Sequence, residues 1–513
     1  MKKRRIGARD FAPGKQHGFH WFIGGDTSHS YWWAMLFIIL LAACTPTPEN
    51  VQKSDALPPM YPDYTDIWIP CNIAPLNFFL RGDFEAVEVV ATLGDQQLQV
   101  NEKGDEVCFD IDEWHEFIEN AKGKEVSVKV TALKNGQWTE YRQFAWHVTN
   151  DSIDPYLTYR LIEPDYEIYQ NLTLQERCLE NFEERAISHY GLTGNRCMNC
   201  HTYANQRSDL SMFYVRGEGG GAILNRNGQL SKLNIKTDGM VSGSVYFGFS
   251  PTGKYITFSS NIIIPAFHAM PKKRLEVFDS KSDVYVADLT TNTILSSSLL
   301  SDSLCFETFP TFSPDGRYIY YCTAPATSLP DGLENMRYSL CRIPFDEQTG
   351  NIGTEVDTLF SGPTQGLSVC HPRISPDGQR IVFSVADYGT FPIWHPEADL
   401  RMMNLTTGET DSMTVVNSEK SDTYHSWSSN SRWLVFASKR DDGLYGKPYF
   451  CYIDAEGKCH KPFVLPQKNP HFYDLNLKSF NAPELGRGSL PFSAADTQRA
   501  LEGEGVNFKF SDN

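Results

Sequence analysis

Apolar and polar residues alternate along much of the chain, and this alternation predicts strands. The runs 86–91 (AVEVVA) and 126–131 (VSVKVT) place every second side chain on one face, which is typical of half-buried strands. Asn135-Gly136 predicts a hairpin turn between two such strands. The stretch 112–121 (DEWHEFIENA) has helical spacing instead. We therefore expect a small β-sandwich over residues 64–150, immunoglobulin-like by analogy, with one short helix.

The character of the pattern changes after residue 150. The run 173–187 (TLQERCLENFEERAI) has apolar residues at helical intervals among charged ones. It predicts a helix within a connector that covers residues 151–210.

Beyond the connector the chain repeats itself four times, at intervals of 53 to 63 residues. The copies are 250–258 (SPTGKYITF), 313–321 (SPDGRYIYY), 375–383 (SPDGQRIVF) and 428–436 (SSNSRWLVF). Proline, aspartate and glycine favour a tight turn, and the aromatic and aliphatic run after them favours a buried strand. Asp315 and Asp377 are expected to serve this turn, because no ladder of alternating carboxylates accompanies them as calcium would require.

This periodicity resembles the PD40, or WD40-like, repeats of TolB-like β-propellers. The resemblance covers roughly residues 241–467 and implies a mainly β fold. One repeat would supply one four-stranded blade, and the spacing leaves room for five or six blades. We expect the propeller to occupy residues 211–480, with a carboxy-terminal tail over 481–513.

The amino terminus has the features of an export signal. Basic residues at 2–5 precede an apolar run at 31–43, which is short for a bilayer-spanning helix but suits a signal peptide. The sequence Leu-Ala-Ala-Cys ending at Cys44 resembles a bacterial lipobox. We therefore expect a signal peptide over 1–43, a lipid on Cys44 and an extended tether over 44–63.

Charge and the residue after the lipidated cysteine bear on partners and location. The formal net charge is −17, and no Lys/Arg stripe offsets it, so the composition argues against a nucleic-acid partner. By analogy with lipoprotein sorting, Thr45 favours an exported protein anchored to the outer membrane.

The clearest chemical signal is the pentapeptide 197–201 (CMNCH). Cys197 and Cys200 have the spacing of the thiols that attach haem c, and His201 would be the proximal iron ligand. A disulfide or another metal site remains an alternative. For the second axial position the candidates are His268, Met212 and Met270, and an open position is also possible.

Nine cysteines remain after Cys44 and the two of the pentapeptide are set aside. In an oxidising compartment, Cys71 with Cys108 and Cys322 with Cys341 are plausible disulfides.

The whole mature chain resembles a set of lipid-anchored, haem-c-bearing TolB-like proteins. The shared segments are 159–164 (YRLIEP), 306–310 (FETFP), 425–431 (HSWSSNS) and 439–445 (KRDDGLY). The resemblance implies the architecture and one covalent haem c. It leaves the biochemical role open.

Two functions are consistent with these features. The first is electron transfer in the cell envelope, with the propeller as the docking face for an envelope or redox partner. The second is an envelope binding module for a protein, peptide or glycan, in which the haem is structural. A hydrolase is disfavoured because the chain contains no G-x-S-x-G sequence.

Overall fold

The computed structural model describes residues 46–163, 171–270 and 273–511. Every element below belongs to one compact unit, Thr47–Asn513. The predicted signal peptide and the lipidation site Cys44 lie outside the described residues. Within the described ranges, no helix is long and apolar enough to cross a membrane.

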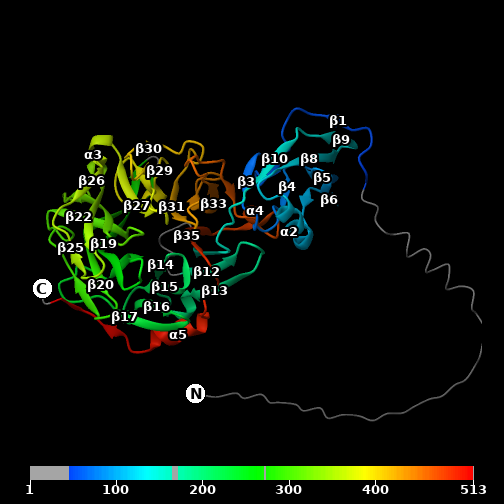
Figure 1. The fold of residues 1–513 in the computed structure, drawn as a ribbon. Helices are drawn as coiled ribbons and strands as arrows, with labels where there is room; N and C mark the ends of the chain where they lie inside the picture. Colours follow the sequence, from blue (N-terminus) through cyan, green and yellow to red (C-terminus); the bar gives the residue numbers. More distant parts are fainter. Residues whose placement is uncertain (1–45, 164–170, 271–272, 512–513) are drawn as a thin grey trace, which may run out of the picture. The chain divides into compact units, whose positions relative to one another are not determined.

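The first domain contains two sheets and a helix (Figure 1). Its larger sheet consists of β1 (Gln52–Lys53), β3 (Ile67–Ile69), β5 (Ala86–Leu93), β6 (Gln96–Lys103), β8 (Glu125–Lys134), β9 (Gln137–Glu140) and β10 (Phe144–Val148). The smaller sheet consists of β2 (Met60–Tyr61), β4 (Phe78–Leu80) and β7 (Glu106–Val107). Trp114 from helix α2 (Ile111–Asn120) packs against Trp146 in the core.

Two local predictions for this domain are confirmed. Helix α2 covers the amphipathic stretch, and Asp110 caps it by accepting hydrogen bonds from the backbone N–H groups of Asp112 and Glu113. Asn135 and Gly136 both have positive φ, 52° and 71°, and join β8 to β9. This is the turn geometry that brings two adjacent strands into a tight hairpin.

The helix predicted for residues 173–187 is wrong. The segment forms two antiparallel strands, β12 (Thr173–Cys178) and β13 (Glu184–His189). The charged residues that suggested a solvated helix face are ion-paired instead. Glu176, 1% exposed, accepts a 2.8 Å hydrogen bond from Arg185 of the neighbouring strand, and Arg177, 2% exposed, donates one of 2.8 Å to Glu184. Neighbouring strands thus satisfy buried charges in a way that the sequence pattern does not reveal.

Six further sheets, each with four or five strands, are present in the described part of the chain. The first combines β11 (Tyr156–Ile162), β12 and β13 with β35 (Ser479–Gly486). The second contains β14 (Met198–Ala204), β15 (Arg207–Val215), β16 (Gly221–Arg226), β17 (Gln229–Asn234) and β36 (Val506–Asn507). The third contains β18 (Ser244–Phe249), β19 (Tyr255–Met270), β20 (Lys273–Asp288), β21 (Thr293–Leu295) and β37 (Lys509–Phe510).

The remaining three sheets follow in chain order. The fourth contains β22 (Cys305–Phe312), β23 (Tyr318–Pro325), β24 (Ser339–Asp346), β25 (Asn351–Ile352) and β26 (Asp357–Phe360). The fifth contains β27 (Ser368–Ile374), β28 (Arg380–Ala386), β29 (Asp399–Asn404) and β30 (Thr410–Asp411). The sixth contains β31 (Asp422–Trp427), β32 (Trp433–Ser438), β33 (Lys447–Tyr452) and β34 (Phe463–Val464). The helices α3 (Gly362–Gln365), α4 (Phe472–Leu475) and α5 (Ala494–Glu502) and the short 3₁₀ turns η2 (Tyr190–Leu192), η3 (Leu333–Asn335) and η4 (Pro392–Trp394) lie between strands.

These sheets form a β-propeller, with their inner strands in a closed ring (Figure 1). Around the ring the inner strands β14, β18, β22, β27, β31 and β35 each contact the next, and β35 contacts β14. Strand β35 comes from the carboxy-terminal part of the chain, yet it pairs with β11 from before the ring. The two ends of the propeller therefore close within one sheet, which joins segments more than 300 residues apart.

The turn of each repeat connects an inner strand to the second strand of its sheet. In the copy at Ser313, the serine hydroxyl accepts a 3.0 Å hydrogen bond from the Tyr318 backbone N–H and donates one of 2.6 Å to Asp315. Asp315 in turn accepts from the backbone N–H of Arg317. The aspartate is a turn residue, as the sequence predicted.

Each inner strand also contains one non-glycine residue with positive φ, at an irregularity in the strand pairing. These six bulge residues are Cys200, Tyr246, Phe309, His371, Tyr424 and Ala482, with φ between 47° and 56°. A bulge turns a side chain away from the regular alternation and is a common device beside binding sites.

No disulfide joins any of the eleven described cysteines. Cys322 is opposite Leu340, whereas Cys341 is opposite Tyr321. The two cysteines therefore lie on opposite faces of their sheet, and the predicted Cys322–Cys341 disulfide is not formed. Cys71 is buried after β3, while Cys108 is exposed after β7 of the other sheet, and they are not joined either.

Candidate functional site

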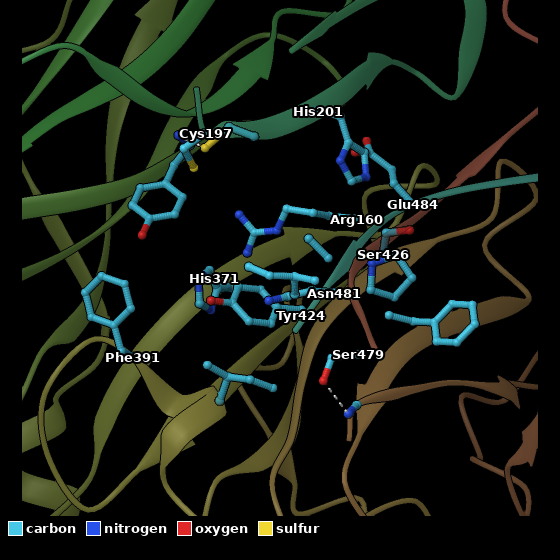
Figure 2. A pocket seen from close by; sticks show the side chains of 18 of the residues that line it. Arg160, Cys197, His201, His371, Phe391, Tyr424, Ser426, Ser479, Asn481 and Glu484 are labelled. Atoms are coloured by element: carbon cyan, nitrogen blue, oxygen red, sulfur yellow. Dashed lines mark hydrogen bonds between the residues drawn. The ribbon is translucent and has the colours of Figure 1, made fainter. Parts of the chain in front are cut away.

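A cavity of about 430 Å³ lies where the inner strands of the propeller meet (Figure 2). Its lining comes from five of the six inner strands and from β11, so residues distant in sequence face one space. The volume is in the range of pockets that hold small molecules and cofactors. The pentapeptide residues that line it are Cys197, Cys200 and His201.

Cys197 immediately precedes β14, Cys200 lies within it, and neither is on a helix, which corrects the helical connector expected from the sequence. Cys200 is the bulge residue of its strand, with φ of 56°. Its sulfur accepts a 3.2 Å hydrogen bond from the backbone N–H of Tyr246 on β18. Burial raises the pKa of the Cys200 thiol, and the nearby Arg216 opposes this shift. The bulge therefore presents a protonated thiol to the cavity next to the thiol of Cys197.

His201 follows the bulge and is held as a neutral imidazole. Burial, with the charge of Arg160 as the next cause, lowers its pKa to about 4, while hydrogen bonding to the backbone of Ala482 and Thr158 acts in the opposite direction. Its Nε2 atom is buried and has no hydrogen-bond partner. A buried, neutral imidazole with an unpaired nitrogen has a lone pair that can bind a metal.

Four further bulge residues form an aromatic cluster beside the cysteines. The ring of His371 lies 4.1 Å from that of Phe309, 4.6 Å from that of Tyr424 and 6.0 Å from that of Tyr246, measured between centroids. Tyr246 and His371 come from strands two steps apart around the ring. Their contact shows that these side chains converge at the centre of the propeller. Tyr246, His371 and Tyr424 line the cavity, and Phe309 packs behind them.

The cavity is also rich in cationic side chains, although the chain as a whole is acidic. Its charged lining residues are Arg160, Glu163, Arg196, Arg216, Arg373, Lys439 and Glu484. Glu484 accepts hydrogen bonds from the Thr202 hydroxyl and the Tyr203 backbone N–H, at 3.2 and 3.1 Å. Burial raises the pKa of Glu484 to about 7 despite the opposing charge of Arg373. At neutral pH the wall therefore carries an excess of positive charge, which suits an anionic group.

The structure separates the candidates for the second axial position. Met212 is 1% exposed within a hydrophobic cluster between strands and is absent from the described lining of the cavity. The side chains of His268 and Met270 lie outside the described residues, although both positions fall within β19.

The sequence prediction missed the residues that the other inner strands bring to the cavity. His371, Tyr246 and Tyr424 each precede the serine of a repeat by four residues, and this constant offset was a usable signal. Arg160 had no such signal, because only the pairing of β11 with β35 brings it there.

The residues at this cavity fit a covalently attached haem. Such a group needs two thiols separated by two residues, a following imidazole with an unpaired nitrogen, and a largely apolar space. Cys197, Cys200 and His201 meet the first two requirements, and the lining that includes Tyr246 and Tyr424 meets the third. A site made only of protein ligands fits less well, since the described residues contain no group of three or more His, Cys, Asp or Glu side chains placed to hold a metal ion.

Comparisons with known proteins give little beyond the architecture. No family model and no curated protein matches the sequence. Among solved structures, an oligogalacturonate lyase in complex with manganese is 12% identical, with 60% of this chain and 72% of that chain covered and a TM-score of 0.33. The β-propeller domain of the Trilobed protease from Pyrococcus furiosus is 15% identical, with 50% and 68% covered and a TM-score of 0.26. A DUF4784 family protein from Bacteroides caccae is 9% identical, with 69% and 94% covered and a TM-score of 0.29.

Likenesses this distant carry no conclusion about chemistry. The propeller is established by the strand pairing and ring closure of this chain itself.

Proposed function

We propose that the chain is a lipid-anchored, six-bladed, TolB-like propeller that carries one haem c in its central cavity and transfers electrons in the cell envelope. The six sheets would be the six blades, the upper of the two numbers expected from the repeats. One observation carries the proposal. The two thiols and the imidazole of the CMNCH pentapeptide open onto one enclosed cavity, and the Nε2 atom of His201 has no protein partner there.

Three residues of the pentapeptide have distinct tasks in this proposal. Cys197 and Cys200 would provide the thiols for two thioether bonds, and His201 would provide the Nε2 lone pair for the iron. The backbone of Ala482 and Thr158 lies within hydrogen-bonding range of this imidazole and would help to orient it. A bound haem c supplies reversible one-electron transfer. The low pKa of His201 keeps the ligand deprotonated throughout the neutral range.

The surroundings suit a redox centre more than an open catalytic one. The aromatic rings of Tyr246 and Tyr424 give the cavity an apolar lining. Cationic side chains in the same lining, such as Arg373, favour the site in its more negative, reduced state. They also suit the carboxylates of a haem.

Location and partner belong to the same proposal. A lipid on Cys44 would tether the protein, through the segment 44–63, to the outer membrane. The electron partner would be an envelope protein that docks on the propeller. The overall acidity of the chain favours a partner with a basic docking face.

The test is a spectroscopic redox titration of protein produced together with a cytochrome c maturation system. We expect reduced-minus-oxidised bands of haem c that titrate as a single one-electron centre. Protein that folds and carries no such bands would contradict the proposal.

The second candidate is an envelope binding module in which the haem is structural. The observation in its favour is the positively charged wall of the cavity, which suits an anionic glycan or peptide. In that case a reduced and an oxidised sample would bind the same partner, and no electron transfer to it would be detected in stopped-flow mixing.

A further inference from the structure

His371 is the buried polar side chain whose chemistry the fold does not explain. It is the bulge residue of β27, lines the central cavity and is 6% exposed. Neither Nδ1 nor Nε2 has a hydrogen-bond partner. An unsatisfied buried polar atom costs about 1–3 kcal/mol, and His371 carries two.

The fold does not require a histidine at this position. The same position of the neighbouring inner strand β22 holds Phe309, which is 2% exposed and packs in the same cluster. The other bulge positions hold tyrosine, cysteine or alanine. A phenylalanine would fill the space at His371 without an unsatisfied nitrogen, so the imidazole points to a ligand.

The environment keeps this imidazole neutral. Burial lowers the pKa of His371 well below its usual value, and the charges of Arg373 and His425 act in the same direction. A neutral imidazole has a lone pair to donate and is the form that binds transition metals.

The position of His371 relative to the pentapeptide follows from the order of the strands. From β14 the ring passes through β18 and β22 to β27, which is three steps in a ring of six. His371 therefore comes from the inner strand that is furthest around the ring from the strand of Cys200 and His201, and Figure 2 shows His371 and His201 separated in the cavity.

The described alternatives are weaker. His425 also lines the cavity, and its Nδ1 atom is buried without a partner. Its Nε2 atom, however, lies 2.8 Å from the carbonyl oxygen of Val382, so the fold has a use for this histidine that it lacks for His371. Met212 is packed between strands away from the cavity.

We propose that His371 is the second axial ligand of the haem, opposite His201, so that the centre is six-coordinate with two histidines. The inference rests on the proposed function. With His371 bound, the iron would have no vacant coordination position for an added ligand such as cyanide. Two imidazoles also give a lower reduction potential than an imidazole and a methionine would.

The experiment compares three variants of the full chain, produced with the maturation system and checked for haem content and folding. His371→Gly removes the ligand and leaves a space for added imidazole. His371→Phe copies the residue found at Phe309 and preserves the packing. His425→Ala is the matched control, a neighbouring buried histidine at the same cavity.

For the wild-type protein and His425→Ala we expect the low-spin electron paramagnetic resonance signal of bis-histidine haem, and no cyanide or carbon monoxide complex at low ligand concentration. Both His371 variants should lose this signal completely, become high-spin and bind these ligands. Added imidazole should restore the low-spin signal in His371→Gly and not in His371→Phe.

Two results would overturn the inference, and they are distinguishable. A wild-type protein with covalent haem whose low-spin signal persists in both His371 variants removes His371 as the ligand and leaves the proposed function intact. A folded wild-type protein without covalent haem removes the proposed function and this inference together.

Discussion

Two positions four residues apart in each of the four repeats differ, one at the bulge of an inner strand and one in the turn that follows the strand. The first contributes to the centre of the propeller, and the second stabilises its fold. The turn position holds serine in all four repeats, at 250, 313, 375 and 428, and each hydroxyl accepts a hydrogen bond of 2.9 to 3.1 Å from the backbone N–H five residues later. The bulge position before it holds tyrosine, phenylalanine, histidine and tyrosine. The turn therefore repeats because every blade needs it, whereas the bulge varies because the cavity needs different groups.

The largest effect on haem content is expected at Cys197 and at Cys200, the bulge residue of β14. Replacing both Cys197 and Cys200 by serine should abolish covalent haem while leaving the unfolding midpoint of the haem-free protein nearly unchanged. The reason is that neither sulfur is needed for strand pairing. Haem-stained denaturing gels and denaturant unfolding measure the two quantities.

The matched control is Cys370→Ser, which changes a buried cysteine that does not line the cavity. It should keep its covalent haem. Loss of haem in the control, or retention of haem in the double variant, would contradict the assignment of Cys197 and Cys200 as the attachment residues.

At the turn we expect a substitution to change stability and not haem content, the reverse of the result expected for the two cysteines. Ser375→Ala leaves the backbone N–H of Arg380 without its 3.0 Å acceptor and should lower the free energy of unfolding by about 1–3 kcal/mol. Haem content per folded molecule should not change. Urea unfolding monitored by tryptophan fluorescence gives the first quantity, and the haem spectrum gives the second. A turn variant that lost haem without losing stability would contradict the separate roles assigned to the turn and the bulge.

The pH dependence of stability should differ in sign between cavity and turn. Burial raises the pKa of Glu484 to about 7, so the folded state retains a proton that the unfolded state has lost above about pH 4.5. Stability from this group is complete at low pH and falls as pH rises through about 7, by at most about 1.4 kcal/mol per pH unit. Glu484→Gln should flatten this fall in haem-free protein.

Asp315 at the turn supplies the comparison. Burial works against its ionisation, but hydrogen bonds from Ser313 and Arg317 prevail, and the pKa of Asp315 is lowered. Its contribution is present at neutral pH and is lost on acidification below about pH 4.

The measurement is a series of urea unfolding curves at different pH values. If the free energy of unfolding changed equally with pH in Glu484→Gln and in the wild-type protein between pH 5 and 7, the assignment to Glu484 would be contradicted.

The smallest change in stability is expected for Arg317, whose side chain lies on the exposed surface of the turn. Arg317 is paired with Asp315 in an exposed position, where solvent weakens the attraction between the two charges. Arg317→Ala should therefore unfold at nearly the same urea concentration as the wild-type protein and keep its haem. A larger loss would show that the turn depends on this ion pair more than on the serine hydroxyl.

The repeat was sufficient to predict the propeller and the role of its turns. Proline, aspartate and glycine act within a few residues of each other, so local sequence carries that information. The helix expected at 173–187 shows the limit of such reasoning. Glu176 and Arg177 looked solvated, and only a neighbouring strand reveals that they are buried and paired.

The cavity could be predicted only in part. The pentapeptide was visible, and the offset from each repeat serine pointed to His371. The approach of Arg160, Arg373 and Glu484 to the same space depends on ring closure between distant strands. No local pattern in the sequence contains that contact.

The most direct test of the central claim is a pyridine haemochrome spectrum of purified, denatured wild-type protein, combined with intact-protein mass spectrometry. We predict the absorption bands of haem attached through two thioether bonds and a mass increase of one haem per chain. The Cys197→Ser/Cys200→Ser variant should show neither. A wild-type protein that matures beside a functional cytochrome c in the same cells, folds, and still carries no added mass would contradict the account.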